Sequence, residues 1–233
     1  MDVSVKLDTS KFERAAAELK KQLPYASSVA LNNVAFRIRG EERSAMGRVF
    51  KNPAKLTLNS VLVKKATKCS GIAKIFIRDQ ATNGTAPSKY LAPSVIDVKR
   101  NDKRFERALQ HMGVLPSGMY VVHGKAARLN KHGNISAATY KKILAELRAG
   151  SGSGQDKKGK YFVGKVNGVL GVWKRAGSKR RPTVKPILIF LRGKPDYKKR
   201  FPFLRIAEGI ARRHLPIELN KAMDHAIATA KRP

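Results

Sequence analysis

The dipeptide Asn167-Gly168, set between two apolar segments, constrains the fold of this chain more than any other feature. Both residues tolerate the positive φ that a two-residue type I′ turn requires, and such turns join the strands of β-hairpins. The flanking segments, 161–166 and 169–174, are rich in valine and aromatic residues, which are typical of strands. The sequence therefore predicts a β-hairpin, and with it an antiparallel sheet, in the second half of the chain.

Two further segments have strand character. Residues 72–78 are rich in isoleucine and carry a phenylalanine, and residues 183–191 repeat that composition after a basic loop. Because proline cannot donate a hydrogen bond to a sheet, Pro186 indicates an edge strand or a bulge. The Leu/Val pattern of residues 56–68 fits either a strand or a helix.

Apolar residues at helical spacing mark both ends of the chain. Near the start, Ser10 and Glu13 form a capping-box pattern, and Pro24 is expected to end one helix and begin a second that extends to about residue 49. Near the end, two helical stretches, 203–214 and 216–230, are expected to be separated at Pro216. We expect these helices to pack together on the sheet, with buried positions at Ala16, Leu19, Ile206, Ile210, Met223 and Ile227.

The region between the first strand and the hairpin is irregular. Residues 79–100 and 114–135 carry glycine and proline and are expected to be loops, while a short helix around residues 105–112 and a second one capped by Ser136 lie beside them. Because these helices are short and the loops long, we expect this region to contact other subunits rather than to complete the core.

The order of elements predicts an α+β fold, in which a small antiparallel sheet packs against N- and C-terminal helices and a central insertion interrupts the core. We expect residues 1–78 to supply the N-terminal helices and the first core strand. Residues 79–157 would form the insertion. Residues 158–233 would supply the hairpin, a strand and the C-terminal helices of the same core.

The chain is strongly basic, with 49 Lys and Arg against 16 Asp and Glu, a formal net charge of +33. So much like charge predicts an anionic partner, either nucleic acid or an acidic protein surface. No apolar run approaches the ~18 residues that a membrane span needs, so we expect no membrane partner. The densest basic clusters are candidate contacts with polyanions or with neighbouring subunits, and they contain Lys64, Lys65, Lys174, Arg175, Lys179, Arg180, Arg181, Lys198, Lys199 and Arg200.

Catalytic patterns are scarce, and we expect no enzymatic activity, cofactor or metal. The densest acidic group, Asp97, Asp102 and Glu106, would suit a metal-dependent nuclease, but a structural role is favoured. In that role Asp102 lies at a helix start and Glu106 pairs with a basic neighbour. His214 and His225, with Glu218 between them, have loose spacing for a metal site. The single cysteine excludes an internal disulfide.

The C-terminal segment 212–219 (RRHLPIEL), followed by a Lys-Arg end at 231–232, resembles the end of the prophage minor tail protein Z family. Residues 24–68 are similar too, through an Ala/Asn/Val helix that leads into a basic Leu/Val segment. The resemblance implies a non-enzymatic virion protein of a tailed bacteriophage, assembled in the host cytoplasm: a tail-completion or head–tail connector subunit.

Such a subunit would bind other tail, connector or portal proteins, form a ring of identical copies, and make non-specific contact with DNA. Residues 79–157 lie outside the shorter members of that family. The alternative function is that of a basic nucleic-acid-binding protein, associated with the nucleoid or the ribosome. That alternative requires tight binding of polyanions by the isolated chain.

Overall fold

A computed structural model describes residues 10–82, 84–96, 98, 100–149, 159–193 and 199–230. The chain divides into two compact units. The first combines residues 1–91 with residues 200–233, and the second contains residues 92–199. Both contain helices and an antiparallel sheet, which confirms the predicted α+β class.

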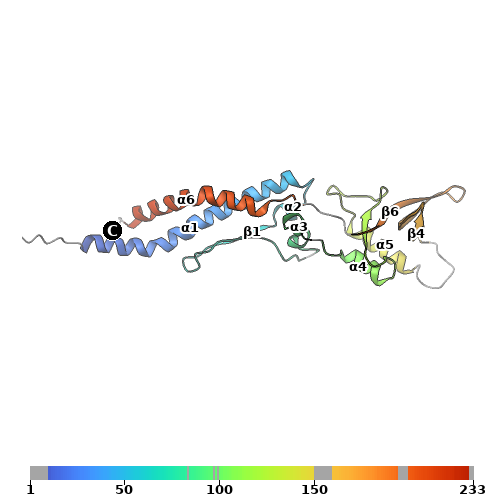
Figure 1. Ribbon diagram of the computed structural model, residues 1–233, viewed down its shortest axis with the longest axis horizontal. Helices are drawn as coiled ribbons and strands as arrows, with labels where there is room; N and C mark the ends of the chain where they lie inside the picture. The colour runs from blue at the N-terminus through green and yellow to red at the C-terminus, as the bar shows by residue number, and fades with distance from the viewer. Residues whose placement is uncertain are drawn as a thin grey trace, which may run out of the picture. The chain divides into compact units, whose positions relative to one another are not determined.

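Two long helices, α1 (Ser10–Val49) and α6 (Phe203–Ala230), form the frame of the first unit and run side by side (Figure 1). They are antiparallel, because Gln22 contacts Thr229 and Asn33 contacts Glu218. Between Ala26 and Met46, every fourth residue of α1 is buried, as in the i±4 rows that pack helices against their neighbours. These buried residues are Ala26, Ala30, Val34, Ile38, Glu42 and Met46.

Both long helices continue through a proline, which corrects the predicted breaks at Pro24 and Pro216. A proline inside a helix removes one hydrogen bond and costs about 3 kcal/mol. Packing between the two helices extends to both sides of Pro24, since Gln22 contacts Thr229 and Ala26 is buried. Pairing over many turns therefore keeps the helices continuous through positions that would end an isolated helix.

A small antiparallel sheet of β1 (Val61–Lys64) and β2 (Lys74–Ile77) packs against these helices, as the sequence predicts. Ile75 of β2 joins Val34, Ile38 and Ile210 in one apolar cluster. The short helices α2 (Lys55–Leu58) and α3 (Pro87–Val95) precede β1 and follow β2. The ambiguous segment 56–68 is thus part helix and part strand.

The predicted burial of the C-terminal helix is correct for part of its length. Ile210 is buried and Ile206 half-buried, but Met223 and Ile227 are 37% and 38% exposed. Ile210 and Ala226 are the buried residues of α6, and the positions between them in steps of four, 214, 218 and 222, are half-buried. This row of least exposed positions passes beside Met223 and Ile227 and leaves both side chains outside it. The side chains of Ala16 and Leu19 lie outside the described residues.

The second unit contains a four-stranded antiparallel sheet in the order β3-β6-β5-β4. Its strands are β3 (Met119–His123), β4 (Tyr161–Val166), β5 (Val169–Gly177) and β6 (Pro182–Arg192). The predicted hairpin is confirmed: Val166 pairs with Val169, and φ is 47° at Asn167 and 80° at Gly168. Pro186 lies on an interior strand at a register shift, where Val172 pairs with Leu188 and Trp173 with Pro186. Of the two alternatives predicted for Pro186, the bulge is therefore confirmed, and the strand is not at an edge.

The expected insertion is corrected most strongly, because it supplies much of the core of the second unit. The helices α4 (Arg104–His111) and α5 (Ala137–Ala149) cover the sheet. The strand β3, which pairs with β6, lies in a segment that was expected to be irregular. The hairpin therefore shares its core with residues 92–149 and not with the terminal helices. The buried residues of this core are Leu109, Leu115, Val121, Ile135, Ile143, Leu147, Val172, Ile187, Leu188 and Phe190.

Candidate anion-binding surfaces

The predicted basic loop between β5 and β6 presents its cations at the end of the second unit's sheet. The guanidinium of Arg175 lies 4.5 Å from the ring centre of Phe162, and its Nε donates a hydrogen bond to the Gly159 carbonyl at 3.1 Å. Lys174 is half-buried beside it. Lys179, Arg180 and Arg181 are exposed and are the residues of this loop best placed to meet an anion.

The remaining predicted cations are separated between the two units. Lys64 and Lys65 lie exposed at the end of β1 in the first unit, where the Lys65 ammonium is 5.5 Å from the ring centre of Phe36. Arg200, in the same unit, lies over Phe50 at 5.4 Å. Lys199 is exposed and belongs to the second unit, and Lys198 lies outside the described residues. The cations predicted as polyanion or subunit contacts are thus divided among several local clusters.

A groove of about 400 Å³, which no local pattern in the sequence predicts, lies between α1 and α6, and we call it the arginine groove. Its α1 wall follows positions 37, 41, 45 and 48, which lie on one flank of a helix, and its α6 wall repeats every four residues from position 205. Only the antiparallel pairing of the helices brings these flanks together. The groove is lined by Arg37, Glu41, Ala45, Arg48, Arg205, Ile206, Gly209, Ile210, Arg213 and His214.

The charge of the arginine groove is available to a partner. Arg48 donates to the Ser44 hydroxyl at 2.8 Å, and Arg213 donates through Nε to the Gly209 carbonyl at 3.1 Å, so both side chains are oriented but not neutralised. Among the described residues, the ion pairs are Arg100–Glu106 and Lys221–Glu218, and neither involves the groove. Four guanidinium groups therefore face one carboxylate, that of Glu41.

A second basic hollow, of about 570 Å³, lies in the second unit where α4 meets α5. We call it the α4–α5 hollow. Arg104, Arg107 and His111 come from α4, and Arg148 comes from the last turn of α5. Ala108 and Met112 complete its lining, which includes no carboxylate. The spacing of 104, 107 and 111 on one helix face is visible in the sequence, but the arrival of Arg148 is not.

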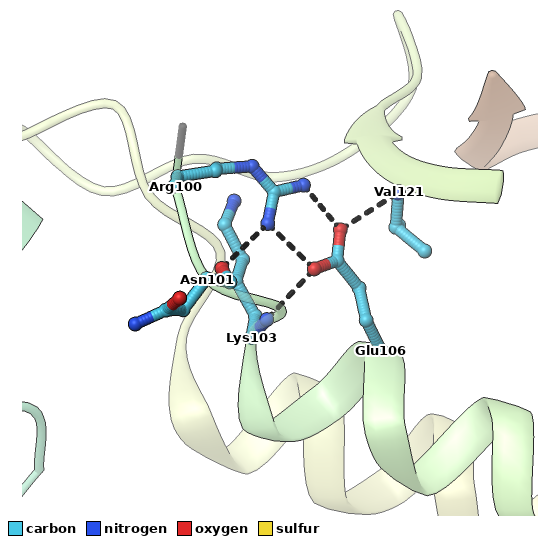
Figure 2. A network of polar contacts seen from close by, with 5 residues as sticks. All are labelled: Arg100, Asn101, Lys103, Glu106 and Val121. Atoms are coloured by element: carbon cyan, nitrogen blue, oxygen red, sulfur yellow. Dashed lines mark hydrogen bonds and ion pairs between the residues drawn. The ribbon is translucent and has the colours of Figure 1, made fainter. Parts of the chain in front are cut away.

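Glu106, one member of the acidic group considered as a nuclease site, lies at the centre of a network of polar contacts (Figure 2). The Glu106 carboxylate, 1% exposed, accepts two hydrogen bonds from the Arg100 guanidinium, one of them 2.7 Å long. It also accepts the backbone N–H groups of Lys103 at 2.7 Å and Val121 at 2.8 Å. The predicted pairing of Glu106 with a basic neighbour is confirmed. The network joins the start of α4 to β3.

Burial alone would raise the pKa of Glu106, but its hydrogen bonds and the charge of Arg100 outweigh burial and hold the pKa below its usual value. Such a carboxylate has its acceptor positions filled and is not free to bind a metal. Asp102 is half-buried just before α4, and Asp97 lies outside the described residues. Within the described part of the chain, no three His, Cys, Asp or Glu side chains are grouped to hold a metal ion.

A second buried carboxylate, Glu42 of α1, has the opposite surroundings. It is fully buried, and neither of its side-chain oxygens has a hydrogen-bond partner among the described residues. Burial raises its pKa to about 8, so the side chain is mostly protonated at neutral pH. The sequence gives no sign of this, since Glu42 follows Glu41 in a helix rich in charge.

Protein-family models, curated proteins and solved structures were all compared with the chain, and none matches it. No helix in the described ranges is long and apolar enough to cross a membrane.

Proposed function

We propose that this chain is a structural virion protein of a tailed bacteriophage, a tail-completion or head–tail connector subunit that acts by binding its neighbours. The observation that carries the proposal is the placement of the two segments that resemble the minor tail protein Z family. Residues 24–68 supply most of α1 together with β1, and residues 212–230 belong to α6. These segments are far apart in the chain, yet they pack together in one unit.

The surface of that unit supports a binding role. Large apolar side chains are exposed on both long helices, among them Tyr25 and Phe36 on α1 and Leu204 and Ile217 on α6. Exposed apolar residues on a strongly basic unit suit a surface that becomes buried in an assembly. The proposed partners are tail, connector or portal proteins and further copies of this chain arranged in a ring.

Deletion of the gene from the genome that carries it, followed by negative-stain electron microscopy, tests the proposal. The expected products are heads without tails, or tails with unfinished ends, and the wild-type chain supplied in trans should restore complete particles. Normal infectious particles from the deletion would overturn the proposal.

The α4–α5 hollow supports a second candidate function, that of a basic nucleic-acid-binding protein. Its three arginines, with no carboxylate among its lining residues, suit a phosphate backbone. That function requires tight, salt-dependent DNA binding by the isolated chain. Each lost phosphate contact makes the negative slope of log K against log salt shallower by about 0.9. If the β5–β6 loop makes ~3 such contacts, changing Arg175, Lys179, Arg180 and Arg181 to Ala should flatten the slope by roughly 3. An unaltered slope would mean that this loop meets protein rather than DNA.

A further inference from the structure

We infer that the arginine groove binds an acidic, partly apolar segment of a neighbouring protein, and not the backbone of a nucleic acid. The inference deepens the proposed function and rests on it for the identity of the neighbour. It concerns one face of the first unit, where α1 and α6 run antiparallel.

The walls of the groove are suited to carboxylates. Arg37 and Arg48 are exposed on one wall, and Arg205 and Arg213 on the other. A guanidinium offers paired N–H donors in a plane, which match the two oxygens of a carboxylate and form hydrogen bonds about twice as strong as neutral ones. Because cations stand on both walls, an acidic helix or strand lying in the groove could be gripped from both sides.

The floor of the groove is apolar, which separates a peptide from a phosphate backbone. Ala45 and Ile210 are buried there and Ile206 is half-buried. A phosphodiester chain has no apolar side to cover such a floor, whereas an amphipathic segment does. Glu41 also lies in the groove, and it repels an unbroken row of phosphates while a peptide can meet it with a polar or basic residue.

The contrast with the α4–α5 hollow sharpens this choice. That hollow has three arginines and no carboxylate, so a phosphate row would meet no repulsion there. The arginine groove combines cations, one anion and an apolar floor, which is the composition of a protein–protein contact.

Gly209 lines the groove, is exposed, and has open space beside it. A Cβ added at Gly209 would meet no atom within 4 Å, so no packing constraint requires glycine at this helical position. A glycine inside a helix costs roughly 0.5–1 kcal/mol relative to alanine. The gap gives a partner side chain access to the floor, and it offers a way to fill the groove without touching a charge.

The first experiment compares two double variants that remove the same charge from the full-length chain. Arg37→Ala/Arg205→Ala changes one arginine on each wall, and Arg39→Ala/Arg212→Ala removes two exposed arginines of the same helices outside the groove. The probes are a fluorescent amphipathic peptide of about 20 residues rich in Glu and Leu, and a duplex DNA of about 20 base pairs. Fluorescence anisotropy at physiological salt gives each affinity.

We expect the groove variant to weaken peptide binding about tenfold, equal to about 1.4 kcal/mol, and the outside variant to weaken it less than threefold. DNA binding should fall equally with both variants, because it follows net charge. Equal peptide losses from the two variants would overturn the inference. So would a DNA loss specific to the groove variant, since it would identify a nucleic-acid site.

Two substitutions of Gly209, one large and one small, test the groove without changing its charge if the arginine variants lose structure. Gly209→Leu should block peptide binding and leave DNA binding unchanged, while Gly209→Ala should bind the peptide as the wild type does. Unchanged peptide binding in Gly209→Leu would count against the groove. These outcomes can be told apart from those of the gene deletion. If the groove variant loses peptide binding but the deletion gives normal particles, the virion role is removed and the groove site stays. If the deletion gives defective particles but the groove variant binds the peptide normally, only the groove site is removed.

Discussion

Glu106 and Glu42 are both buried glutamates on helices, yet the two units surround them in opposite ways. In the second unit, Arg100 and two backbone N–H groups fill the acceptor positions of Glu106. In the first unit, Glu42 has no hydrogen-bond partner among the described residues, and its pKa rises to about 8. A buried carboxylate can therefore be kept charged by a partner or kept neutral by its surroundings, and the sequence does not say which.

The difference extends to the arginines. The second unit uses Arg100 inside its structure, where it is 7% exposed. In the first unit, Arg37 and Arg48 come from the same helix as Glu42 but line the arginine groove. This difference fits the proposal that the groove arginines of the first unit bind a neighbouring protein. Variants in each unit test the comparison.

The largest effect is expected from Arg100→Ala. It leaves Glu106 buried without its charged partner, which typically costs 3–5 kcal/mol. The single tryptophan, Trp173, is buried in the same unit, so its fluorescence during urea unfolding measures this free energy. Arg104→Ala, an exposed change on α4, is the control and should cost under about 0.5 kcal/mol. A cost below about 1 kcal/mol for Arg100→Ala would mean that the network is not important for folding.

The next effect is a pH dependence due to Glu42. Burial raises the pKa of Glu42 from its usual value of 4.5 to about 8, so between these pH values the unfolded chain has lost a proton that the folded chain retains. Stability should fall as pH rises through this window, by up to about 1.4 kcal/mol per pH unit, and level off above the folded pKa.

Unfolding of wild type and Glu42→Gln, followed by the circular dichroism of the helices, isolates this dependence. From about pH 5 to pH 7, the free energy of unfolding of wild type should fall by up to about 3 kcal/mol more than that of Glu42→Gln. Parallel pH profiles for the two proteins would show that Glu42 finds a partner or water in solution.

A smaller effect is expected from Asn32→Ala, which removes a satisfied polar group from the same helix. Asn32 donates to the Ala66 carbonyl at 3.0 Å and accepts the Ala66 N–H at 2.7 Å, so it holds the segment after β1 against α1. The loss should be about 1–2 kcal/mol and independent of pH. Asn33→Ala is the matched control, because its bond to Glu218 is exposed and should be worth less. A pH-dependent loss in Asn32→Ala would undermine the assignment of the pH dependence to Glu42.

The features that the sequence predicts correctly are local. Asn167-Gly168 determines its hairpin through backbone conformation, and Ser136 caps α5 by accepting the Thr139 N–H at 3.1 Å. The features that it misses depend on partners distant in the chain. Pro24 lies within a helix because α6 packs beside it, and β3 is a strand because β6 pairs with it.

The same reason separates the predicted cations from the arginine groove. Clusters such as 179–181 are consecutive and can be seen in the sequence. Arg37 and Arg205 are far apart in the chain and share a groove only after α1 and α6 pair. Charge density along a sequence thus finds basic loops, but it does not find basic grooves.

A cryo-EM reconstruction of the tailed particle made by the genome that encodes this chain tests the central claim most directly. The account predicts density for α1 and α6 at the tail end or the head–tail junction, with an acidic segment of a neighbouring protein lying between Arg37 and Arg205. Absence of the chain from the particle, or an arginine groove that faces DNA or open solvent in the assembled particle, would contradict it.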